Sequence, residues 1–179
     1  RVWSFSNKNS LILSSNARPF ETFSAKLENE FNTDWLPKSA NWSFETIVGS
    51  TKASYSGKNS NLIGLRLAIN PLKKLSFELL QTSQWNKNIS SLQTLGPILF
   101  GNSNEGTYSS INKMAGFGLS YLIPYNKNTY RVYGQTVGED EAGNLPSCLS
   151  YLAGLEWTNL KIKYPTTINI EAIDTRTYT

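Results

Sequence analysis

The chain has 179 residues, a formal net charge of +4 and no histidine. Without histidine, a Ser-His-Asp relay is excluded and the commonest zinc ligand is missing, and the single cysteine, Cys148, cannot form an internal disulfide. The basic residues are spread singly and form no clustered stripe, so no nucleic-acid partner is expected.

Alternation of apolar and polar residues, together with a short apolar run at 10–15, predicts an all-β chain with nine strands. The clearest strand is 62–70, where Ile63, Leu65 and Leu67 alternate with Gly64 and Arg66. The predicted strands, in chain order, are 10–15, 20–29, 42–49, 62–70, 75–79, 115–123, 130–137, 151–157 and 168–172.

The connections between these strands alternate in length. Residues 71–74 and 124–128 are short and rich in Pro, Asn and Lys, which is typical of tight turns. Residues 50–60, 86–111 and 138–149 are longer, and the last of them begins with an acidic loop. Short turns at one end and long loops at the other indicate an antiparallel meander that forms part of a transmembrane outer-membrane β-barrel.

Periodicity alone does not tell which face of the sheet is inside. In a soluble β-sandwich the apolar face would be the core, whereas in a membrane barrel it would face lipid. Two features favour the membrane. The polar face is rich in glycine, as at Gly116 and Gly154, which suits a crowded lumen, and aromatic residues such as Trp42, Tyr130 and Trp157 gather near strand ends.

Three segments, in the same order, resemble the capsule assembly Wzi family. Residues 10–19 read SLILSSNARP, residues 62–85 contain the hairpin pattern of that family, and residues 133–147 read YGQTVGEDEAGNLPS. The resemblance implies a monomeric outer-membrane barrel in contact with lipid, described as a lectin that holds capsular or extracellular polysaccharide and is not an enzyme. Members are much longer, so we expect residues 1–179 to be an internal portion of a larger barrel that lacks N- and C-terminal parts.

Two groups of residues are candidates for polysaccharide binding. The acidic residues 139–141 could contact sugar directly, hydrogen-bond lumen arginines or the amides of their own loop, hold a cation or act as glycosidase carboxylates. The first two alternatives fit their spacing best. The second group consists of aromatic and Asn residues at the ends of the longest loop, 86–111. Aromatic rings can stack on sugar rings, and Asn amides can hydrogen-bond to sugar hydroxyls. The candidates are Glu139, Asp140, Glu141, Trp85, Asn86 and Tyr108. Neither a metal nor a cofactor is expected.

Charged residues on the predicted polar face are expected to pair across the lumen. A second hypothesis gives the same residues a role in anchoring an anionic polymer. They are Arg18, Glu45, Arg66, Glu78, Arg131, Glu156 and Glu171. A diffusion porin or transporter, with these charges setting its selectivity, is the alternative to the lectin, and a soluble sandwich module is the third hypothesis.

Overall fold

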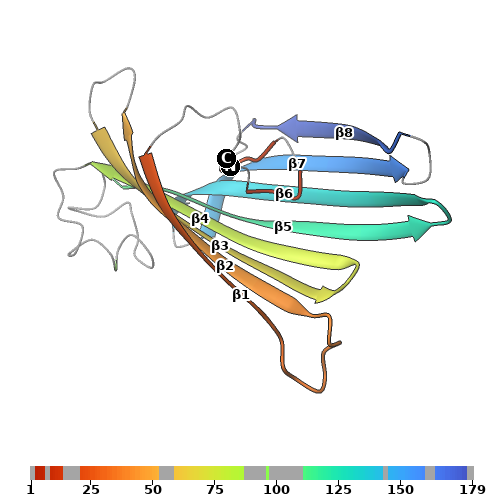
Figure 1. Cartoon of the computed structure of the whole chain (residues 1–179). Helices are drawn as coiled ribbons and strands as arrows, with labels where there is room; N and C mark the ends of the chain where they lie inside the picture. Colours follow the sequence, from red (N-terminus) through yellow and green to blue (C-terminus); the bar gives the residue numbers. More distant parts are fainter. Residues whose placement is uncertain are drawn as a thin grey trace.

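The computed structural model describes residues 3–6, 9–13, 21–52, 59–86, 96, 111–142, 145–159 and 164–176. Within these ranges the chain forms one antiparallel sheet of eight strands, each paired with its neighbours along the chain (Figure 1). The strands are β1 Glu21–Glu30, β2 Asn41–Lys52, β3 Asn59–Leu72, β4 Leu75–Asn86, β5 Asn112–Tyr125, β6 Asn128–Ala142, β7 Leu145–Asn159 and β8 Thr166–Asp174.

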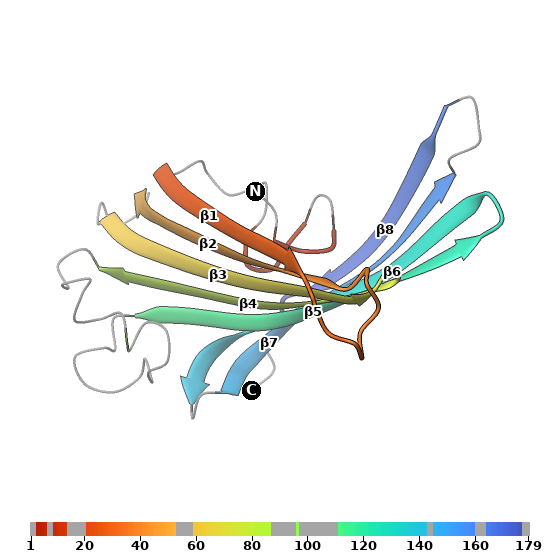
Figure 2. The same cartoon turned by 60° about the horizontal axis from the view of Figure 1, so that its bottom comes forward.

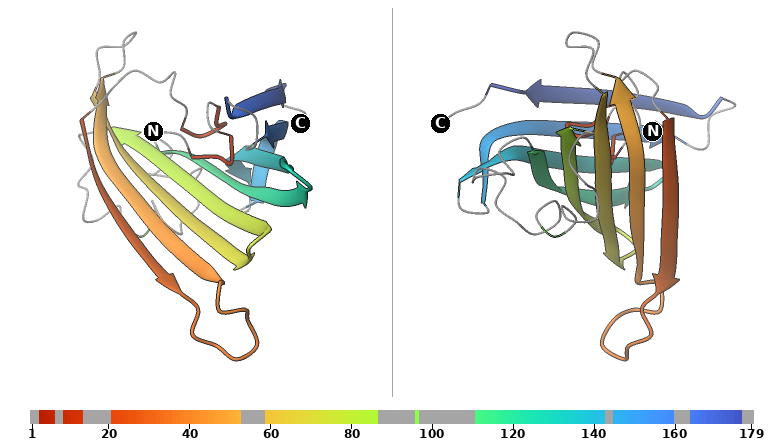
Figure 3. Two further views of the ribbon diagram at one scale, coloured as in Figure 1. Left: turned by 45° about the vertical axis from the view of Figure 1, so that its right-hand side comes forward. Right: turned by 90° about the vertical axis from the view of Figure 1, so that its left-hand side faces the viewer.

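The sheet is strongly curved and open. Figure 2 shows it bent into a trough, and Figure 3 shows the same trough from two further sides, with β1 and β8 at its edges. Register shifts lie between Ile69 and Leu72 in β3 and between Val137 and Ala142 in β6, and such irregularities increase local twist and bending. An open, curved meander is consistent with part of a β-barrel.

The convex face carries the apolar side chains, and they are exposed. In β5, Phe117 and Leu119 are 58% and 43% exposed, whereas Gly118 and Ser120, which alternate with them, are buried on the concave face. Phe23 in β1 is 74% exposed. The described residues contain no second sheet that could cover this face, so the arrangement differs from that of a soluble sandwich.

Eight of the nine predicted strands are confirmed, and the prediction for 10–15 is wrong over the residues that the structure describes. Residues 11–13 adopt bends. The Ser10 hydroxyl accepts hydrogen bonds from the backbone N–H groups of Ile12 (3.2 Å) and Leu13 (3.1 Å). This local side-chain bonding competes with a strand ladder, so an apolar run alone did not produce a strand.

The prediction of a long loop at 138–149 is also wrong. β6 continues to Ala142 and β7 begins at Leu145, with Glu139 paired to Ser147. The backbone ladder extends beyond the apolar alternation because strand pairing depends on main-chain groups. The short turns are confirmed at 73–74 and 126–127, where Asn126 has a φ of 54°. Among the described residues, no helix is long and apolar enough to cross a bilayer.

Candidate functional site

The concave face holds an ion-paired group on three neighbouring strands. β2, β3 and β4 carry Glu45, Arg66 and Glu78. Arg66 donates from Nε (3.0 Å) and Nη2 (2.9 Å) to Glu78 Oε2, and its Nη1 lies 3.9 Å from Glu45 Oε2. The Glu78 side chain is completely buried, so its negative charge depends on these partners.

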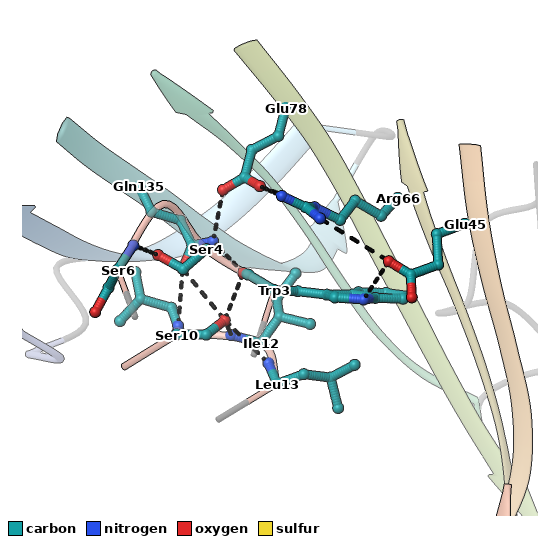
Figure 4. Close-up of polar contacts among 11 residues, drawn as sticks. Trp3, Ser4, Ser6, Ser10, Ile12, Leu13, Glu45, Arg66, Glu78 and Gln135 are labelled. Atoms are coloured by element: carbon teal, nitrogen blue, oxygen red, sulfur yellow. Dashed lines mark hydrogen bonds and ion pairs between the residues drawn. The ribbon is translucent and has the colours of Figure 1, made fainter. Parts of the chain in front are cut away.

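The first described residues of the chain lie across this concave face. We call residues 3–6 and 9–13 the N-terminal segment. Trp3 is fully buried and packs against Ile47 and Leu80, and its indole Nε1 donates to Glu45 Oε2 at 3.1 Å (Figure 4). A Cβ atom added at Gly64 would lie 2.8 Å from the Trp3 ring. The glycine therefore provides the space that the indole occupies.

One amide side chain joins the N-terminal segment to the ion-paired group. Gln135 of β6 donates from Nε2 to the backbone oxygen of Trp3 (2.7 Å) and to Glu78 Oε1 (3.2 Å). Its Oε1 accepts from the backbone N–H of Leu11 at 2.8 Å. Gln135 is buried, so these bonds replace those that its amide would make with water.

A second polar group occupies the concave face of β6, β7 and β8. Arg131 Nη2 lies 2.7 Å from Glu156 Oε2, and the Arg131 guanidinium lies over the Tyr133 ring at 5.2 Å from its centroid. The Tyr133 hydroxyl donates to Glu171, which also accepts from the side-chain amide of Asn9. The N-terminal segment is therefore tied to both halves of the trough.

Of the six predicted polysaccharide-binding residues, the structure describes the side chains of two, Trp85 and Glu139, and these two lie apart. Trp85 lies near the end of β4 and is buried, and its indole Nε1 has no hydrogen-bond partner among the described residues. Glu139 is exposed. Glu139 and Thr82 both pair with Met114 of β5, so their side chains share one face of the sheet. Trp85 is three residues from Thr82 along β4 and therefore faces the opposite side. The side chains of Asn86, Asp140 and Glu141 lie outside the described part of the structure, as do residues Arg18 and Tyr108.

Trp3 and Asn9 were not predicted as site residues because they precede the first predicted strand, and Gln135 was placed on a predicted strand without a role in a site. The signal that could have found them is the glycine content of the polar face. Gly64 accommodates Trp3, and an added Cβ at Gly154 would overlap the Tyr133 ring. In the described part of the chain, no group of three or more His, Cys, Asp or Glu side chains could hold a metal ion.

Comparisons with known proteins point to one family. The family model described as "Capsule assembly protein Wzi" matches residues 1–179. A Klebsiella pneumoniae protein described as "Uncharacterized 55.8 kDa protein in cps region" is 28% identical over 181 residues, which cover 98% of this chain and 36% of that protein. The chain thus spans about a third of that relative's length. No solved structure matches.

Proposed function

Because the chain belongs to the capsule assembly protein Wzi family, we propose that it is part of a monomeric, non-catalytic outer-membrane β-barrel that retains capsular or extracellular polysaccharide at the cell surface. The match of the family model over the whole chain is the observation that carries this proposal. Polysaccharide and outer-membrane lipid are its two partners.

The convex face supports the membrane part of the proposal. Its exposed side chains include Leu79, Phe117, Tyr121 and Ile170, which would be poorly placed in water. The strands contain 9 to 15 residues, and a transmembrane β-strand needs about 9–11. A meander also satisfies the backbone groups of its inner strands by pairing, which the bilayer interior requires.

The N-terminal segment favours a retention barrel over the alternative, a porin or transporter. The segment lies on the concave face and is bonded to Gln135 and Glu45, so it fills space that a water-filled channel would need. Planar-bilayer conductance of the full-length protein separates the two functions. A retention barrel passes little current, whereas steady porin-like conductance would support the alternative.

Polymer contact at the β6–β7 hairpin is the part of the proposal that concerns individual residues. Glu139, Asp140 and Glu141 lie close to the turn between these strands, at the end of the sheet opposite the short turns. The triple substitution Glu139→Gln, Asp140→Asn and Glu141→Gln removes three charges and keeps side-chain size. We expect cells with this variant to shed more surface polysaccharide into the medium than wild-type cells.

The matched control is Asp34→Asn, which removes an exposed carboxylate from the connection between β1 and β2, at the short-turn end of the sheet. Polysaccharide retention should be unchanged in this control. Equal retention in the triple variant and the control would show that the hairpin acids do not hold the polymer. Loss of retention in a strain without the protein tests the function itself.

A further inference from the structure

The convex face has an apolar groove over the middle of β6, on the opposite side of the sheet from the ion-paired group. The groove has a volume of about 470 Å³. Its two smallest lining residues, Gly134 of β6 and Ala153 of β7, pair with each other in the sheet. Leu119 of β5 pairs with Gly134 on the other side. Leu119 and Ala153 are exposed, so the groove opens outward.

The walls of the groove are larger side chains on the same face of the three strands. They are Phe117 and Tyr121 of β5, Val132 and Thr136 of β6, and Tyr151 of β7. None of the described lining residues is charged. The Thr136 hydroxyl already donates to the backbone oxygen of Ser150 at 3.1 Å. The groove therefore offers a ligand mainly apolar contact.

Gly134 differs from the glycines of the concave face. A Cβ atom added at Gly64, Gly118 or Gly154 would lie within 3 Å of a side chain that packs against that glycine, such as the Tyr133 ring at Gly154. Among the described residues, a Cβ added at Gly134 would meet only a backbone oxygen, at 3.4 Å. A glycine inside a strand often marks a place where a ligand approaches the backbone closely.

The position of Gly134 along β6 gives the depth of the groove in a membrane. Gly134 is six residues after Asn128, the first residue of β6, and eight before Ala142, the last. With a rise of about 3.4 Å per residue and a tilt of about 40°, it lies about 15 Å from the short turns along the membrane normal. The apolar band of an outer-membrane barrel is about 25 Å tall, so hydrocarbon surrounds the protein at this depth.

We propose that this groove binds an acyl chain of a membrane phospholipid. The groove is slightly nearer the short turns, which are periplasmic in outer-membrane barrels, so the chain comes from the periplasmic leaflet. Aromatic rings at Phe117, Tyr121 and Tyr151 provide rigid apolar walls for it. This inference rests on the membrane part of the proposed function, because it assigns a site to the lipid partner.

The test is native mass spectrometry of the full-length protein in detergent, titrated with dioleoylphosphatidylethanolamine. Gly134→Leu places a side chain in the groove, and the residue has space for it on the convex side. This variant should bind the first lipid about tenfold more weakly than the wild type, as expected when about two methylene groups lose their contacts. Dioleoylphosphatidylglycerol should give the same result, because the groove contacts the chain and not the headgroup.

A second variant and a matched control keep the test decisive if Gly134→Leu misfolds. Ala153→Leu fills the groove from β7 and should also weaken lipid binding several-fold. Ala172→Leu makes the same change on β8, at the exposed residue that pairs with Ala153 and does not line the groove. The control should bind lipid like the wild type.

The possible failures are distinguishable. If both groove variants bind lipid like the control, the groove is not a lipid site, while the proposed function stands. A strong preference for one headgroup would overturn recognition through the chain. Wild-type dimers that Gly134→Leu dissociates would assign the groove to a second copy of the protein and also overturn the proposal. A wild type that stays in solution without detergent would instead refute the membrane part of the proposed function.

Discussion

Substitution of Arg66 by methionine should strongly destabilise the sheet. Glu78 would be left in a fully buried position without its two hydrogen bonds from Arg66, where burial opposes the ionised form of its carboxyl group. Removing one partner of a buried ion pair costs about 3–5 kcal/mol. Gln135 would still donate to Glu78 Oε1, so we expect a cost near the lower limit, about 3 kcal/mol.

The free energy of unfolding can be measured by urea titration of the full-length protein refolded into lipid vesicles. The double variant Arg66→Met/Glu78→Gln, which removes both charges, should recover most of the loss. The control Arg176→Met removes an exposed arginine that pairs with Asp174, and its effect should lie within experimental error. A single variant as stable as the wild type, or a double variant as unstable as the single one, would refute this reasoning.

Three further predictions test the two faces of the sheet. Gly154→Ala should lower the free energy of unfolding by about 1–3 kcal/mol, because the added Cβ would overlap the Tyr133 ring. In the same titration Gly134→Ala should be neutral or stabilising, because the Cβ added there meets only a backbone oxygen at 3.4 Å. Gln135→Ala should speed hydrogen exchange at the Leu11 amide, measured by mass spectrometry. Leu119→Arg should cost about 2–4 kcal/mol in vesicles if Leu119 lies near the bilayer midplane.

Each of these predictions has a contrary result. Equal stability of the two glycine variants would mean that Tyr133 does not need the space at Gly154. Unchanged exchange at Leu11 would show that Gln135 does not hold the N-terminal segment. An arginine tolerated at position 119 without cost would place that side chain in water.

The strands could be predicted because alternation reflects a local requirement: successive side chains of a strand point to opposite faces of the sheet. In β5, the contrast between Phe117 and Gly118 is visible in the sequence and is present in the structure. The ends of β6 and β7 could not be predicted in this way. There the ladder continues through polar residues such as Glu139, where side chains carry no apolar signal.

The N-terminal segment could not be predicted because its contacts are distant in sequence. Trp3 and Gln135 are 132 positions apart, and no motif links them. The predicted set of charged residues did contain Arg66 and Glu78, because they lie on the polar face of adjacent strands. The sequence could not show that Trp3 would occupy the space above Gly64, although the glycine itself indicated that something large lies there.

The orientation of the two sheet faces is the central claim, and site-directed spin labelling tests it most directly. Nitroxide labels are placed at positions 119 and 120 in a Cys148→Ser background, and their collision rates with molecular oxygen and a water-soluble nickel chelate are measured in vesicles. We predict that the label at 119 collides mainly with oxygen, as in lipid, and that the label at 120 does not. A label at 119 that collides mainly with the nickel chelate would contradict the membrane orientation and the function proposed from it.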